Sequence, residues 1–111
     1  HEGNVEPCIF TQFAIDNVKH KSLFEIMKSD FFKKLREEQP YNKNTFLPCM
    51  WLDNPEYARN ICCTYAEPTY EGSDVMATDP IVQETLDEYA KQVSGLYAPL
   101  EKEIEDMETR A

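Results

Sequence analysis

The sequence predicts an all-α fold of four helices, arranged as two stacked antiparallel hairpins and stapled by two disulfides. Apolar residues recur every three or four positions in four stretches, and little of the alternation typical of strands is present. The chain contains only 3 Gly, so few positions favour sharp turns. Its 4 Cys occur without C-x-x-C spacing, which favours disulfides over a zinc site or thiol redox chemistry. At 111 residues the chain should form one domain over residues 1–111.

The first two helices are expected before residue 40. One follows Pro7, a residue suited to the first helical turn, and ends near residues 19–21. The next begins at a capping box formed by Ser22 and Glu25, and it stops before Pro40. Their predicted apolar stripes are Ile9, Phe10, Phe13, Ala14 and Val18 in the first helix and Phe24, Met27, Phe31 and Leu35 in the second.

The last two helices should each start at a polar cap followed by proline, at Asn54-Pro55 and at Asp79-Pro80. The earlier one ends before Pro68. In the later one the apolar spacing continues through Pro99, and the residue four positions back is glycine, which relieves the clash of the proline ring most easily. We therefore expect one long helix kinked near residues 95–99, with a break at Ala98 as the alternative. Long loops remain at residues 40–53 and 68–78.

Two adjacent cysteines, Cys62 and Cys63, lie within the third predicted helix. Neighbouring helical side chains project about 100° apart, so these two thiols should bond Cys8 and Cys49 rather than each other. We favour Cys8 with Cys62 and Cys49 with Cys63, because Cys62 lies on the apolar stripe, and the swapped pairing stays open. The cysteines are thus interpreted as structural.

Charge and composition limit the kinds of molecule that the chain is expected to bind. The net charge is −10, with 8 acidic and 7 basic residues in 1–55 and 13 acidic and 4 basic residues in 56–111. Such acidity excludes nucleic acid and anionic membranes as partners and permits a basic protein surface. The chain opens with His1 rather than Met and has no bilayer-length apolar run, so we expect a secreted, extracellular protein.

No catalytic, metal or cofactor site is expected. Neither His1 nor His20 lies next to a nucleophile in a known spacing, so we predict that the chain is not an enzyme. The carboxylates of Glu84, Asp87 and Glu88 share part of a helix face, which we interpret as a solvated surface rather than a cation site.

Two loops carry the candidate partner-binding residues. Residues 46–52 are apolar and contain Met50 and Trp51, either as a plug in the core or as a partly exposed anchor of an interface. The other loop places Tyr70 beside Glu71 and Asp74.

The size, helix order, acidity and the framework of Cys8, Cys49, Cys62 and Cys63 together resemble the small all-helical salivary proteins of anopheline mosquitoes, the albicin-like family. The resemblance implies a secreted inhibitor of host defence that binds a plasma protein without cleaving it. The implied partner is the C3 convertase of the alternative complement pathway, which consists of C3b and the factor B fragment. The alternative is an odorant-binding-like carrier of a small apolar ligand, suggested by five aromatic residues: Phe10, Phe13, Phe24, Phe31 and Tyr89.

Overall fold

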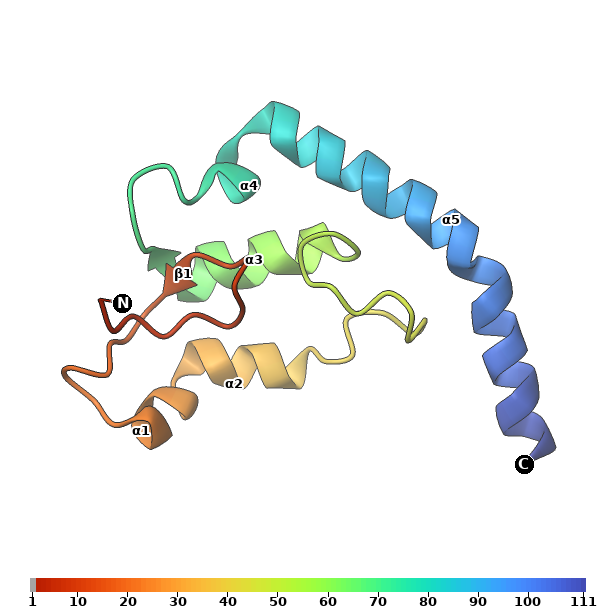
Figure 1. Cartoon of the computed structure of the whole chain (residues 1–111), viewed down its shortest axis with the longest axis horizontal. Coiled ribbons are helices and arrows are strands. Elements are labelled where there is room, and N and C mark those ends of the chain that lie inside the picture. Colours follow the sequence, from red (N-terminus) through yellow and green to blue (C-terminus); the bar gives the residue numbers. More distant parts are fainter. Residues whose placement is uncertain (1) are drawn as a thin grey trace.

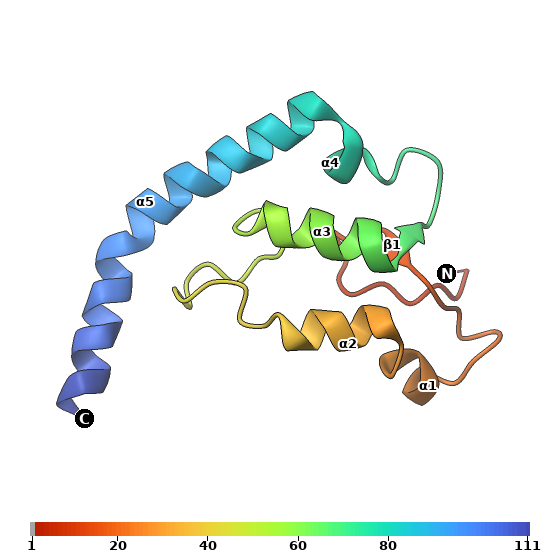
Figure 2. The same ribbon diagram turned by 180° about the vertical axis from the view of Figure 1, so that it is seen from behind.

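The computed structural model describes residues 2–111, and His1 lies outside them. This part of the chain forms five helices and one small antiparallel sheet (Figures 1 and 2). All four cysteines are free thiols. The predicted all-α fold of four helices with two disulfides is therefore wrong. In chain order the elements are β1 (Phe13–Ala14), α1 (Leu23–Met27), α2 (Asp30–Glu37), α3 (Pro55–Tyr65), β2 (Glu67–Pro68), α4 (Val75–Thr78) and α5 (Pro80–Arg110).

The first predicted helix does not form. Its segment instead contains β1, which pairs with β2 in the register Phe13 to Pro68 and Ala14 to Glu67. Ile9 and Phe10 are 82% and 62% exposed, so the expected helical stripe is not buried as one face. The strand partners of Phe13 and Ala14 lie more than 50 residues further along the chain, where local spacing gives no sign of them.

The second predicted helix is split into α1 and α2. Ser22 and Glu25 form the expected capping box, but Ser29 then caps a new helix by accepting a hydrogen bond from the backbone NH of Phe32 at 3.4 Å. The break changes which side faces inward: Ile26 is buried, whereas Phe24 of the predicted stripe is 70% exposed.

The two proline-led helices begin where the sequence predicts, although Asn54 does not cap α3 and its side chain instead donates to the carbonyls of Leu47 and Cys49. Helix α3 starts at Pro55, and α5 starts at Pro80 after Asp79 accepts hydrogen bonds from the NH groups of Ile81 and Val82 at 2.9 and 3.1 Å. Helix α5 continues through Pro99 and changes direction part-way along its length in Figure 1, as the kinked-helix prediction requires.

Helix α5 extends beyond the rest of the fold. None of its 31 residues is buried. The Cα radius of gyration is 16.1 Å, against about 13 Å for a compact domain of this length. The chain is therefore a small body with a long, largely uncovered helix attached to it.

The core lies between α2, α3 and the loop at residues 40–54. Trp51 is 1% exposed, and its ring lies against that of Phe13 with 6.2 Å between centroids. The cluster joins the N-terminal segment to the helices and comprises Phe13, Ile26, Phe31, Phe32, Leu35, Met50, Trp51, Ala58, Ile61, Cys62 and Ala77.

Candidate functional site

A buried hydroxyl joins Cys8 to the core. The indole NH of Trp51 donates to Oγ1 of Thr11 at 2.9 Å, and Sγ of Cys8 lies 3.2 Å from the same oxygen. Thr11 is fully buried, whereas Cys8 is exposed. Cys8 thus presents an accessible thiol that is linked to Trp51 through the Thr11 hydroxyl.

The turn after residue 48 holds Cys49 from three sides. Its backbone NH donates to Asp53 Oδ2 at 2.8 Å, and its carbonyl accepts from Asn54 Nδ2 at 3.0 Å. Its Sγ accepts from the backbone NH of Leu52 at 3.4 Å. Cys49 remains partly exposed, so it presents a second accessible thiol two residues from Trp51.

The adjacent pair on α3 differs from these two. Cys62 is fully buried, and burial raises the pKa of its thiol to about 12, with smaller contributions from Cys63 and Cys8. Cys63 is exposed, but desolvation and then the Asp74 carboxylate raise its pKa as well. The raised pKa makes each of these two thiols harder to ionise than an ordinary cysteine thiol, and the thiolate is the form that binds metals and acts as a nucleophile.

The five predicted partner-binding residues do not form one surface. Met50 is 9% exposed and Trp51 only 1%, so both side chains belong to the core plug rather than to an exposed anchor, although Phe46 and Leu52 of the same loop are exposed. The reason is that the Trp51 ring and its NH both find partners inside, on Phe13 and Thr11.

Tyr70, Glu71 and Asp74 do share an accessible loop. Tyr70 is 60% exposed, Glu71 is exposed and Asp74 is half-buried. The loop is tied to the N-terminal segment because the Ser73 hydroxyl donates to the carbonyl of Gln12 at 3.1 Å. This leaves the Tyr70 side chain outward on an anchored turn.

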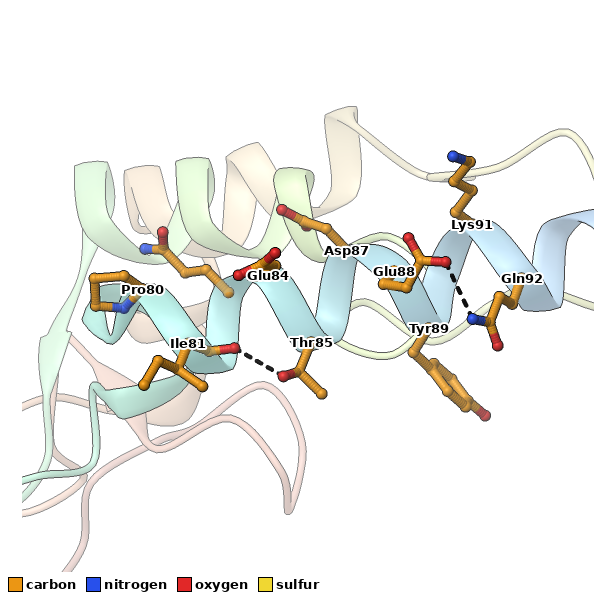
Figure 3. A pocket seen from close by; sticks show the side chains of 10 residues that line it. Pro80, Ile81, Glu84, Thr85, Asp87, Glu88, Tyr89, Lys91 and Gln92 are labelled. Atoms are coloured by element: carbon orange, nitrogen blue, oxygen red, sulfur yellow. Dashed lines mark hydrogen bonds between the residues drawn. The ribbon is translucent and has the colours of Figure 1, made fainter.

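The aromatic residues suggested for an apolar ligand do not surround one cavity. Phe13 and Phe31 belong to the core, while Phe10, Phe24 and Tyr89 are exposed. A pocket along α5 is lined by residues of that helix alone, from Pro80 to Gln92, and Figure 3 shows their side chains pointing out to different sides. One helix gives an open surface and cannot enclose a ligand.

Two acidic side chains of α5, Asp87 and Glu88, already have protein partners. Asp87 accepts from Arg59 Nη2 of α3 at 2.8 Å, and Glu88 accepts from Gln92 at 3.1 Å (Figure 3). Among residues 2–111, no group of three or more His, Cys, Asp or Glu side chains is placed to hold a metal ion. Within the same residues, no helix has the length and apolar character needed to cross a membrane.

Residues 1–50 match the family model of the SPASM iron–sulfur cluster-binding domain. The match covers less than half of the chain, so it marks a similarity of this segment. No curated protein and no solved structure gave a match. The matched segment contains Cys8 and Cys49, the two cysteines outside α3.

The thiols fit an iron–sulfur cluster in kind but not in number. Most such clusters take four cysteine thiolates. The part of the chain from residue 2 onward does not bring three potential ligands together, and burial holds Cys62 as a neutral thiol. Cys8 and Cys49 are thus the candidate ligands within the matched segment, and a complete set of four would require thiolates from elsewhere.

Sequence reasoning missed the role of Thr11, which links the Cys8 loop to Trp51. A single threonine 40 residues from its tryptophan partner leaves no local pattern. The cysteine pairing was misjudged for a different reason: an even count of cysteines indicates disulfides only in an oxidising compartment, and the count alone does not identify the compartment.

Proposed function

We propose that this chain belongs to an iron–sulfur protein in which Cys8 and Cys49 are cluster ligands. The other thiolate ligands of the cluster come from a source other than residues 2–111. The observation that carries the proposal is the match of residues 1–50 to an iron–sulfur cluster-binding domain, because that segment holds the two cysteines that lie outside α3. When bound, such a cluster supplies a site for accepting and donating electrons.

The surroundings of the two thiols suit that role. Each is accessible and each is held by hydrogen bonds that also involve the Trp51 segment, Cys8 through Thr11 and Cys49 through the turn to Leu52. Fixed ligands keep the geometry that a cluster requires and lower the cost of ordering them.

Anaerobic reconstitution tests the proposal. The chain is incubated with ferrous iron, sulfide and excess glutathione, which can occupy the missing thiolate positions. We expect visible charge-transfer absorption with bound iron and sulfide, lost in Cys8→Ser and in Cys49→Ser. Cys63→Ser is the matched control because Cys63 is also exposed, and it should retain the cluster. Equal loss in all three variants, or no cluster in the original chain, would contradict the assignment.

A second candidate is the secreted inhibitor of host defence that binds a protein without cleaving it. The observation that favours it is the anchored loop carrying exposed Tyr70 next to Glu71, since an outward tyrosine on a held turn is a common interface anchor. The implied partner is the alternative-pathway C3 convertase, C3b with the factor B fragment. An acidic surface of net charge −10 would steer it toward basic protein surfaces.

Lysis by the alternative complement pathway tests this second candidate. The chain should inhibit lysis, and Tyr70→Ala should lose at least about tenfold in potency if Tyr70 is an anchor. Tyr89→Ala, which removes another exposed tyrosine on α5, serves as the control and should retain potency. Absence of inhibition by the original chain would rule the candidate out.

A further inference from the structure

The loop between α2 and α3 contacts α5 at the point where that helix bends. The side-chain amide of Asn44 donates to the backbone carbonyl of Tyr97 at 2.9 Å, and the ring of Phe46 is stacked on the Tyr97 ring with 6.2 Å between centroids. Figures 1 and 2 both show this loop extending toward the bent part of α5. We call these two contacts the clasp.

The clasp lies at a weak point of α5. Pro99 has no backbone NH, so the carbonyl of Gly95 loses its helical partner. The space beside Gly95 is open, and no other part of the fold lies within 4 Å of where a Cβ would be. Tyr97 lies between these two residues. The clasp therefore contacts the segment in which α5 changes direction most easily.

Three asparagines connect the clasp to the backbone of Cys49. The backbone NH of Asn44 donates to Oδ1 of Asn42 at 3.0 Å, and Nδ2 of Asn42 donates to Oδ1 of Asn54 at 3.1 Å. Nδ2 of Asn54 in turn donates to the carbonyl of Cys49 at 3.0 Å. Asn44 and Asn54 are 2% and 7% exposed, so water competes little for these hydrogen bonds. The network is continuous from Tyr97 of α5 to the turn that holds the Cys49 thiol.

The contacts that form the clasp are weak enough to open. None of the residues of α5 is buried, and Tyr97 is 38% exposed. One hydrogen bond and one partly exposed aromatic pair stabilise a contact only modestly. Segments held by few buried apolar contacts open more readily than the core does. The clasp therefore has two accessible states, closed and open.

We propose that the direction of α5 beyond Pro99 and the accessibility of the Cys49 thiol are coupled through this asparagine network. With the clasp closed, Asn54 holds the carbonyl of Cys49, and the Cys49 Sγ stays 3.4 Å from the backbone nitrogen of Leu52. When α5 leaves the clasp, the network loses one fixed end, so the turn loosens and the partly exposed thiol becomes more accessible. The long helix thereby regulates access to a surface thiol.

Site-specific alkylation of the iron-free chain tests the coupling. Asn44→Asp keeps the oxygen that accepts from the Phe46 NH but removes the donor to Tyr97. Tyr97→Ala removes the stacked ring and leaves every loop side chain in place. We expect iodoacetamide to modify Cys49 at least about threefold faster in each variant. Leu96→Ala, at a 76% exposed position next to Tyr97, is the control and should change the rate by less than about twofold.

Cys63 of the same molecules separates coupling from general loosening of the fold. It is exposed on α3, outside the asparagine network, and its rate of modification should not change. An equal rise at Cys63 and Cys49 would overturn the proposal. A faster rate at Cys49 in Asn44→Asp but not in Tyr97→Ala would overturn it as well, because the loop would then act without α5. Unchanged rates in both variants would have the same consequence.

The coupling must also act in the opposite direction. In a Cys8→Ser, Cys63→Ser background, N-ethylmaleimide on Cys49 should trap the open clasp and speed hydrogen exchange of the amides at residues 96–101. The label should have no further effect on exchange in Asn44→Asp, whose clasp is already open. Exchange that is unchanged by labelling would contradict the coupling. No iron is present in either experiment, so both outcomes are independent of cluster binding.

Discussion

Replacing Thr11 by valine tests the contact that joins the two thiol-bearing loops. Valine has nearly the shape of threonine, so no cavity is created, but the buried indole NH of Trp51 loses the oxygen that accepts it at 2.9 Å. Leaving a buried donor unsatisfied costs about 1–3 kcal/mol. We expect the free energy of unfolding to fall by that amount, a large part of the roughly 5–15 kcal/mol typical of a whole domain.

Urea unfolding gives the measurement, because Trp51 is the single tryptophan and its fluorescence reports on the core directly. The urea dependence of the free energy should be unchanged, since the surface exposed on unfolding is the same. Thr85→Val is the control: its hydroxyl lies on exposed α5 and donates to the Ile81 carbonyl at 2.8 Å. We expect it to change the free energy by no more than about 0.5 kcal/mol.

A double-mutant cycle separates the hydrogen bond from packing. Trp51→Phe removes the donor, and combining it with Thr11→Val removes both partners, so the two losses should not add. We expect a coupling free energy of about 1 kcal/mol. Unfolding of the variants that lack Trp51 is measured by circular dichroism, because they have no tryptophan fluorescence. If Thr11→Val lowers the free energy of unfolding no more than Thr85→Val does, or if the coupling is zero, the Thr11–Trp51 hydrogen bond does not stabilise the fold.

The remaining predictions concern α3. Because burial raises the pKa of Cys62 from 9.0 to about 12, the folded chain keeps a proton that the unfolded chain loses between these values. The free energy of unfolding should therefore fall as pH rises from 9 to about 12, by at most about 1.4 kcal/mol per pH unit, and Cys62→Ala should remove this part of the slope in urea titrations. If the free energy of unfolding depends on pH equally in Cys62→Ala and in the original chain, Cys62 does not cause the loss of stability. Asp87→Asn leaves the mostly buried Arg59 without its carboxylate partner and should lower the free energy of unfolding by about 1 kcal/mol. The neighbouring Glu84→Gln is the control and should have little effect. If the two variants are equally stable, the ion pair between α3 and α5 does not stabilise the chain.

Local signals predicted the helix ends well. The capping box at Ser22, the proline starts at Pro55 and Pro80, and the continuous helix through Pro99 all depend on residues within a few positions of one another. Capping and proline geometry act through neighbouring backbone groups, so the sequence contains the whole interaction.

Non-local interactions account for the errors. The pairing of β1 with β2 joins Phe13 to Pro68, and the helical spacing of residues 9–18 gives no indication of such a distant partner. The split after α1 could have been found, because Ser29-Asp30 is a recognisable helix start inside the predicted helix. The burial of Trp51 follows from Thr11 and Phe13, neither of which is near it in the chain.

The candidate site was only partly visible in the sequence. Four cysteines could be identified, but their environments could not: Cys62 is sealed in the core, while Cys8 and Cys49 are accessible. That difference arises from tertiary packing, and it is the basis on which Cys8 and Cys49 are proposed as ligands rather than as halves of disulfides.

Site-specific alkylation of the reconstituted chain tests the ligand assignment most directly. The protein is treated with iodoacetamide before and after loading with iron, sulfide and glutathione, and each cysteine is quantified by mass spectrometry. Loading should protect Cys8 and Cys49 from modification and leave the extent of Cys63 modification unchanged, and an iron chelator should restore the reactivity of Cys8 and Cys49. Equal modification of Cys8 and Cys49 in loaded and unloaded protein would contradict their assignment as cluster ligands.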